Sequence, residues 1–174
     1  LKAIVDFYAQ FDPEDSERNF SIPKDIWLAI DTGTHILKAG FQTINWSSTE
    51  AFHPADIINS RFLDSSLQKP SKIGEPIISY KFLFGESSSL TFMYLPYFTD
   101  PIFPSPQSSF GPGFEVDQIQ IYNSNGSFEE DNLINQTAFR FSTNLGGSDI
   151  AINYINHVDR AVSYTHLTLP TKRI

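Results

Sequence analysis

Residues 25–46 read DIWLAIDTGTHILKAGFQTINW, and this stretch decides the fold. Its centre, Asp31-Thr32-Gly33-Thr34, has the composition of a tight turn, because glycine readily adopts the positive φ that such turns require. After the turn, apolar residues alternate with polar or small ones. An alternation of period two places the two kinds of side chain on opposite faces of a strand. The stretch therefore predicts a β-hairpin with strands over 25–31 and 34–46.

The same plan recurs along the chain. Strands are predicted over 76–84 and 88–97 around a turn near Gly85, and over 136–144 and 149–157 around Gly146-Gly147. The first segment, LKAIVDFYAQF over 1–11, alternates in the same way, with only Ile4 out of phase. Together these patterns predict an all-β fold. It is an antiparallel up-and-down meander of seven strands, six of which form three hairpins.

The connections between the predicted strands fall into two classes. Tight turns at 31–34, 85–88 and 145–148 alternate with long polar loops at 12–23, 47–75 and 98–135. In a meander, this alternation puts all the tight turns at one end of the sheet and all the long loops at the other. Such asymmetry is typical of outer-membrane β-barrels, and tilted strands of this length can cross a bilayer. The sequence therefore favours an incomplete transmembrane β-barrel, although a soluble β-sandwich would show the same alternation.

The composition excludes several classes of function. The 174 residues contain no cysteine, so neither a disulfide framework nor a thiolate metal site is encoded. The formal net charge is −8, which argues against nucleic acid as a partner. Only three histidines precede residue 161, in unrelated contexts, and we find no H-E-x-x-H, P-loop or EF-hand motif. We therefore expect neither catalysis nor a bound metal or cofactor.

Polar residues on the inward face of the predicted strands are candidates for lining a pore. Basic side chains occur at similar depth in three different hairpins, and the candidates are Lys38, Gln42, Lys81, Arg140 and Asn153. A basic strip would favour anionic solutes. Alternatively, acids from loops or neighbouring strands neutralise these bases, and the sequence leaves both hypotheses open.

The 47–75 loop contains the segment HPADIINSRF over 53–62. Pro54 suits the first turn of a helix, so a short helix folding into the lumen as a constriction is one hypothesis. An external loop is the other. The apolar residues Ile57, Ile58, Phe62 and Leu63 need cover, which favours inward folding. The candidate constriction residues are His53, Asp56, Asn59 and Arg61.

Six aromatic residues of the predicted strands are candidates for the interfacial girdles of a membrane barrel. They are Trp27, Trp46, Tyr80, Tyr94, Tyr97 and Tyr154. In a β-sandwich, the same residues would be ordinary core aromatics.

A family resemblance rests on the spacing of seven residues, Lys38, Gly40, Gln42, Trp46, Pro54, Asp56 and Asn59. They form a K-x-G-x-Q-x-x-x-W strand followed by a P-x-D-x-x-N loop. This pattern resembles the early hairpin of porin-like outer-membrane β-barrels of Gram-negative bacteria, a group that includes uncharacterised and alginate-export-like members. The segments SSLTFMYLPY and FRFSTNLGGSDIAINYINHVDR resemble later hairpins of such barrels, so the resemblance covers most of 1–160.

The resemblance implies an N-terminal-to-middle piece of one barrel domain in the bacterial outer membrane, with a signal peptide upstream and further strands downstream. Its partners would be outer-membrane lipid and small hydrophilic solutes. Its function would be the passive passage or export of these solutes across the outer membrane. The resemblance is compatible with an oligomer. Two alternatives stay open. One is a non-transporting barrel that acts as a scaffold or adhesin, and the other is a secreted β-sandwich that binds glycans.

The last fourteen residues, AVSYTHLTLPTKRI over 161–174, do not follow the strand pattern. Their back-translation resembles the transposase-end adapter used in short-read sequencing. We therefore expect a native domain over 1–160 and an artefactual tail over 161–174. Without the tail, the chain loses Lys172 and Arg173 but no acid, and its net charge becomes −10.

Overall fold

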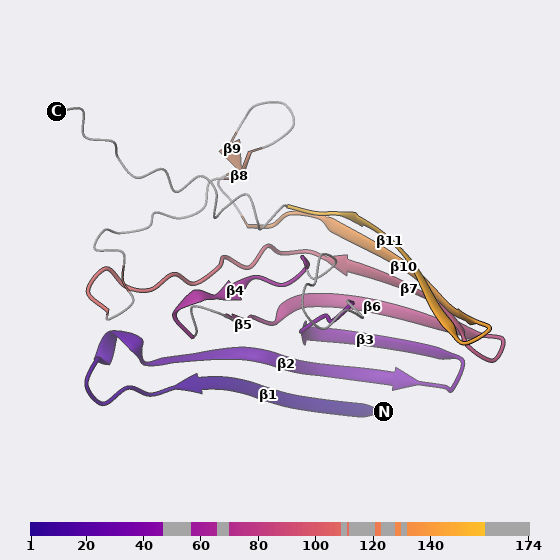
Figure 1. Cartoon of the computed structure of the whole chain (residues 1–174), viewed down its shortest axis with the longest axis horizontal. Coiled ribbons are helices and arrows are strands. Elements are labelled where there is room, and N and C mark those ends of the chain that lie inside the picture. The colour runs from indigo at the N-terminus through magenta and orange to yellow at the C-terminus, as the bar shows by residue number, and fades with distance from the viewer. Residues whose placement is uncertain are drawn as a thin grey trace.

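The computed structural model describes residues 1–46, 57–65, 70–108, 111, 121–122, 128–129 and 132–158. Seven strands form one antiparallel sheet in the order β1-β2-β3-β6-β7-β10-β11 (Figure 1). The strands are β1 (Lys2–Gln10), β2 (Phe20–Asp31), β3 (His35–Gln42), β6 (Glu75–Phe84), β7 (Ser88–Leu95), β10 (Gln136–Leu145) and β11 (Ser148–Asn156). The predicted all-β meander is confirmed, and the sheet is not closed into a barrel.

Two predicted strand boundaries differ from the structure by four or five residues. The second strand begins at Phe20 rather than at residue 25, since a register shift opposite Asp6 and Phe7 accommodates Pro23 in the ladder. The third strand ends at Gln42 rather than at residue 46. Beyond Gln42 the backbone amides bond to side chains instead of to a neighbouring strand: the Thr43 amide donates to Asp25, and the Ile44 amide donates to Asn59.

The remaining elements are short. Two small ladders pair β4 (Arg61–Phe62) with β5 (Ser71–Lys72) and β8 (Ile121–Tyr122) with β9 (Phe128–Glu129). Two 3-10 turns, η1 (Ser16–Arg18) and η2 (Leu63–Ser65), complete the described elements. Within the parts of the chain that the structure describes, no helix is long and apolar enough to span a membrane.

The hairpin turns lie at one end of the sheet, and the long connections lie at the other (Figure 1). Glycines with positive φ make the turns possible: Gly33 at 88°, Gly85 at 63°, and Gly146 and Gly147 at 59° and 87°. At the first turn, the Asp31 carboxylate accepts a hydrogen bond from the Gly33 amide at 2.9 Å. This separation of tight and long connections is the arrangement that the sequence predicts.

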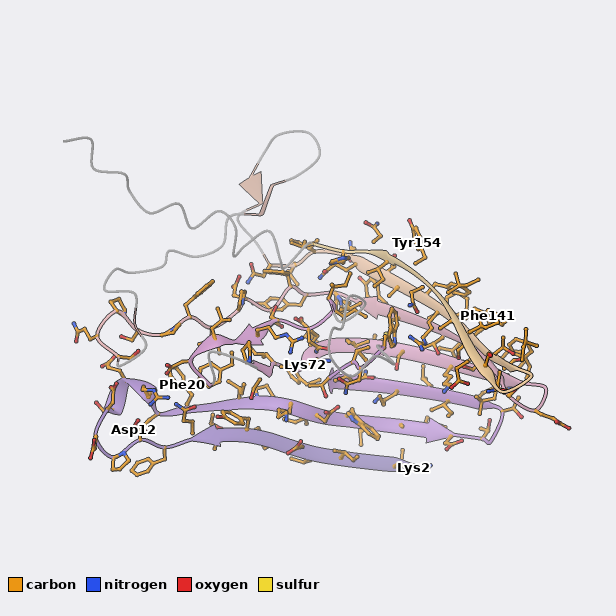
Figure 2. All side chains as sticks on the ribbon, in the orientation of Figure 1. Lys2, Asp12, Phe20, Lys72, Phe141 and Tyr154 are labelled. Atoms are coloured by element: carbon orange, nitrogen blue, oxygen red, sulfur yellow. The ribbon has the colours of Figure 1, made fainter. Side chains whose placement is uncertain are left out.

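The two faces of the sheet differ in chemistry. One face, called here the apolar face, exposes large hydrophobic side chains from all seven strands: Val5, Phe7, Leu28, Ile30, Leu37, Phe41, Ile78, Tyr80, Phe84, Phe92, Tyr94, Leu145, Ile150, Ile152 and Tyr154. On β10, Phe139 and Phe141 pack beside Phe92 and Phe84. Figure 2 shows Phe141 and Tyr154 on the outer side of the β10–β11 hairpin. The opposite face, called the polar face, carries the charged and hydroxyl side chains.

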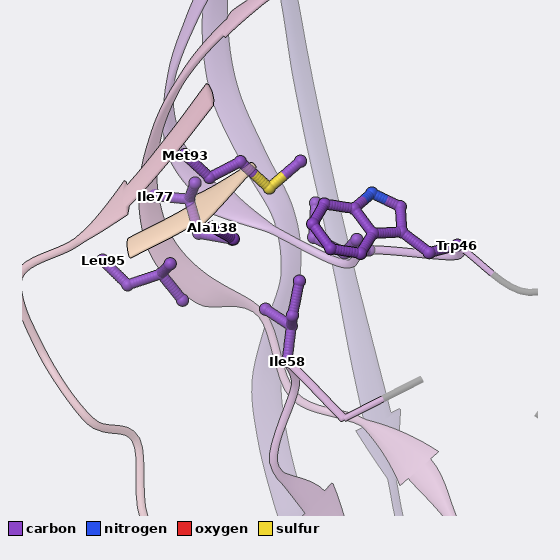
Figure 3. Close-up of a cluster of buried hydrophobic side chains, with 7 residues drawn as sticks. Trp46, Ile58, Ile77, Met93, Leu95 and Ala138 are labelled. Carbon is purple, nitrogen blue, oxygen red and sulfur yellow. The ribbon is translucent and has the colours of Figure 1, made fainter. Parts of the chain in front are cut away.

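Apolar clusters cover the polar face toward the long-loop end. In the first cluster, Trp46 and Ile58 pack against Ile77, Met93 and Ala138 of the sheet (Figure 3). In the second cluster, Phe62 lies among Ile22, Ile73, Tyr8, Phe20 and Ile102. The segment 57–65 therefore folds over the polar face, as the need to cover its apolar residues predicts. It consists of bends, β4 and η2 and contains no α-helix.

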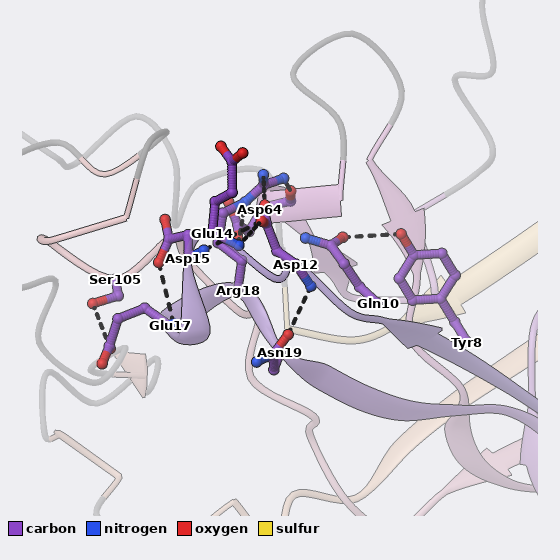
Figure 4. A network of polar contacts seen from close by, with 10 residues as sticks. All are labelled: Tyr8, Gln10, Asp12, Glu14, Asp15, Glu17, Arg18, Asn19, Asp64 and Ser105. Carbon is purple, nitrogen blue, oxygen red and sulfur yellow. Dashed lines mark hydrogen bonds and ion pairs between the residues drawn. The ribbon is translucent and has the colours of Figure 1, made fainter.

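A polar network ties the long connections together at the same end (Figure 4). The guanidinium of Arg18, between β1 and β2, contacts Asp12 at 2.8 Å and the buried Asp64 at 3.4 Å. Glu17 accepts a hydrogen bond from Ser105, which follows β7. Three connections that are distant in sequence are thus joined, which orders the loop end of the sheet.

Candidate functional site

The register of the sheet brings together polar residues from separate hairpins. Lys81 of β6 pairs with Thr91 of β7, Thr91 pairs with Arg140 of β10, and Arg140 pairs with Asn153 of β11. These four residues form one row across the polar face. Lys38 of β3 pairs with Ser79, two residues from Lys81, and therefore lies in the neighbouring row. The similar depth of the three bases follows directly from this register.

A cavity of about 450 Å³ lies over these rows. Residues of β1, β2, β3, β6, β7 and β10 line it, so the sheet curves around it, and the polar face is the concave one. Four of the five pore-lining candidates contribute to its wall: Lys38, Gln42, Lys81 and Arg140. The fifth, Asn153, is not a lining residue and instead accepts a hydrogen bond from Arg140.

Lys38 is half-buried against an aromatic ring. Its Nζ lies 4.2 Å from the ring centroid of Trp27, a cation–π distance. The Trp27 indole N–H in turn donates to the Asp25 carboxylate at 3.1 Å, which fixes the ring. Asp25 influences Lys38 electrostatically, but its oxygens already accept hydrogen bonds from Trp27 and Thr43. The ring therefore positions Lys38 without neutralising it.

Arg140 is oriented by neutral partners. Its Nη1 donates to the carbonyl oxygen of Trp46 at 3.0 Å and to Oδ1 of Asn153 at 3.3 Å. The guanidinium carbon lies 5.6 Å from the ring centroid of Trp46. These contacts join β10 to the segment after β3, and they leave the positive charge of Arg140 without a carboxylate partner among the described residues.

The side-chain amide of Gln42 bonds to the protein, although the residue belongs to the cavity wall. It is fully buried, its Nε2 donates to the Ile77 carbonyl at 2.7 Å, and its Oε1 accepts a bond from Ser79 at 3.3 Å. Because its polar atoms bond to the protein, Gln42 stabilises the junction of β3 and β6.

The two constriction-loop candidates that the structure describes, Asn59 and Arg61, do not line the cavity. Asn59 is buried and joins three backbone groups: its Oδ1 accepts from the Ile44 amide at 2.7 Å, and its Nδ2 donates to the Gln42 and Ile73 carbonyls at 2.8 and 2.9 Å. Arg61 donates to the Pro70 carbonyl at 3.3 Å. His53, Asp56 and the helix start predicted at Pro54 lie outside the described residues, as does the predicted tail over 161–174.

Two of the six girdle candidates, Trp27 and Trp46, line the cavity and do not lie on the apolar face. For Trp27 the sequence contained a signal, because it has the same parity in its strand as Asp25 and Asp31. For Trp46 it contained none, since the residue lies beyond the ladder of β3. Tyr80, Tyr94 and Tyr154 do lie exposed on the apolar face.

The residues that line the cavity include four bases, one acid and four hydroxyl side chains. No group of three His, Cys, Asp or Glu side chains in the described ranges is arranged to hold a metal ion. Comparison with protein-family models, with curated proteins and with solved structures finds no match to this chain.

Proposed function

We propose that this chain forms part of the wall of a bacterial outer-membrane pore. In this proposal the apolar face contacts lipid, and the polar face borders a water-filled passage for small hydrophilic solutes. The strands of the large sheet have 8 to 12 residues, which suits tilted strands that cross a bilayer.

The observation that carries the proposal is the exposed apolar face. Leu28 and Ile152, in different strands, are 60% and 61% exposed, and comparable side chains lie between them. Soluble monomers rarely expose contiguous apolar patches of more than a few hundred Å². Contact with lipid removes the free-energy cost of exposing these apolar side chains to water. The antiparallel ladder satisfies the hydrogen bonds of the backbone groups inside the sheet. A β-sandwich would need a second layer over this face, and no described residue provides one.

A non-transporting barrel is the second candidate, and the packing at the loop end favours it. Trp46, Ile58 and Phe62 cover the polar face there with buried apolar side chains. A barrel filled in this way could serve as a scaffold or adhesin through its connections. Conductance separates the two candidates.

Arginine substitutions at neighbouring positions of β11 test the lipid contact. Ile152→Arg places a charge on the apolar face, whereas Ala151→Arg places it on the opposite face of the same strand. For a lipid-facing position near mid-membrane we expect a loss of about 2 kcal/mol in the free energy of unfolding. An exposed position in water would change by less than about 0.5 kcal/mol. Urea unfolding in lipid vesicles measures both variants, and equal small effects would exclude the lipid contact.

Single-channel recording tests the passage of solutes. Full-length protein, in which further strands close the sheet into a ring, should produce discrete conductance steps when it is refolded in detergent and added to a planar lipid bilayer, because the polar face would then border a wet lumen. The matched control is the heat-denatured protein at the same detergent concentration. Stable insertion without steps would contradict a pore and favour the scaffold.

A further inference from the structure

We propose that the cavity over β3, β6 and β10 is a binding site for small anions such as inorganic oxyanions and carboxylates. The inference names the solute class of the passage and, in that sense, rests on the proposed function. Binding itself, however, can be measured without any pore.

The first support is the convergence of positive charge. Lys38, Lys81 and Arg140 line one cavity although they belong to three hairpins. Neighbouring strands lie about 4.8 Å apart, so Lys81 and Arg140, two strands apart in the same row, start about 10 Å from each other. Long flexible side chains can close this distance onto a single anion of a few atoms. Lys38, one strand further and one row away, can approach from the side.

The second support is the charge balance of the cavity wall. Its described lining residues include four bases, Lys2, Lys38, Lys81 and Arg140, and one acid, Asp31. Asp31 forms an ion pair with Lys2 at 2.9 Å, so each cancels the other. The wall therefore has a net charge of about +3 in a chain whose total is −8. A local excess of positive charge in an acidic protein attracts counter-ions to that place.

The third support is the kind of partner that each base has. Lys38 lies over Trp27, and Arg140 bonds to a carbonyl and an amide oxygen. Rings and neutral oxygens orient a cation but carry no net charge to cancel it. No described carboxylate lies within ion-pair distance of Lys38, Lys81 or Arg140, and the one carboxylate that acts on Lys38 electrostatically, Asp25, accepts its hydrogen bonds from Trp27 and Thr43. A bound anion would make direct contact with these bases.

Hydroxyl groups complete the site. Thr91 lies between Lys81 and Arg140 in the row, and Ser79, Ser89 and Ser142 also line the cavity. Ser89 and Ser142 already share a hydrogen bond of 2.8 Å, which fixes their positions. Each hydroxyl has one hydrogen to donate, and that of Ser79 already goes to Gln42 at 3.3 Å. Thr91 and the accepting member of the Ser89–Ser142 pair keep a hydrogen for anion oxygens, so they add hydrogen bonds where the bases add charge.

Tryptophan fluorescence tests the inference directly, since the only two tryptophans of the chain line this cavity. The chain refolded in detergent is titrated at constant ionic strength with iodide, caesium or neutral acrylamide. We expect iodide to quench more strongly than caesium. Lys81→Glu should lower the iodide quenching constant about twofold or more, because reversing a cavity charge reduces the local anion concentration. The acrylamide constant should not change.

Lys24→Glu is the matched control, because Lys24 lies on β2 outside the cavity lining and the charge change is the same. It should leave iodide quenching unchanged. If Lys81→Glu does not fold, Lys81→Gln and Lys38→Gln provide the same comparison with a smaller effect.

Equal quenching by iodide and caesium, or an unchanged iodide constant in the Lys81 and Lys38 variants, would overturn the inference. A conducting chain without iodide preference would refute this inference alone, whereas iodide preference without conductance would refute only the pore.

Discussion

Replacing Gly40 with alanine should remove a large part of the folding free energy. Gly40 has φ = 131° in the middle of β3, a conformation that L side chains rarely adopt. An added Cβ would lie 2.2 Å from the Ile26 carbonyl oxygen and 2.8 Å from Cα of Trp27, both backbone atoms of the paired strand. Backbone strain and overpacking together should cost about 4 kcal/mol, because neither strand can move without breaking its ladder. Urea unfolding followed by tryptophan fluorescence measures the loss.

Gly33→Ala is the matched control for this substitution. Gly33 also has a positive φ, of 88°, but no atom lies within 4 Å of the position of an added Cβ. It should therefore show the conformational cost alone, about 1 kcal/mol. If both variants lost the same stability, close approach of β2 and β3 at Gly40 would not be the cause.

Asn59→Ala should be the second severe substitution. The side chain is 2% exposed and bonds to three backbone groups, which are the amide of Ile44 and the carbonyls of Gln42 and Ile73. Alanine would leave these three groups without this partner in a buried place. Each unsatisfied group costs about 1–3 kcal/mol, so we expect a loss of about 3 kcal/mol after partial relaxation. Urea unfolding gives the loss, and amide exchange at Ile44 should increase with it.

Asn19→Ala is the comparison for Asn59. The Asn19 side chain accepts one hydrogen bond, from the Asp12 amide at 2.7 Å, in an exposed loop where water can replace it. Its loss should be below about 1 kcal/mol. A small effect of Asn59→Ala, close to that of Asn19→Ala, would mean that the 57–65 segment does not anchor the sheet.

Much of the sheet could be predicted because one physical rule governs it. Side chains alternate between a face that is apolar and a face that is polar, and glycines mark each tight turn. Pro23 hid the start of β2, because a proline in a strand needs an irregular ladder, and only the pairing with Phe7 reveals one. Residues 43–46 alternate between polar and apolar in sequence, but the amides of Thr43 and Ile44 bond to the side chains of Asp25 and Asn59, which lie 18 and 15 positions away.

The candidate site was predictable in part for the same reason. Parity alone placed Lys38, Lys81 and Arg140 on one face. It did not reveal that Trp27 and the segment ending at Trp46 would hold two of these bases. Nor did it show that Asn59 would be an anchor rather than a constriction residue. The contact of Arg140 with Trp46 and the role of Asn59 depend on loops that return to the sheet, and no local pattern encodes such a return.

The number of strands constrains which strands can pair with the two edge strands of the sheet, β1 and β11. Six consecutive antiparallel pairings separate β1 from β11, so these two edge strands point in the same direction. Joining them directly, within one sheet or between two copies related by an axis along the strand direction, would create a parallel seam. A ring that is antiparallel throughout therefore takes an odd number of additional strands between β11 and β1. The parity of the meander, rather than its curvature, sets this rule for closure.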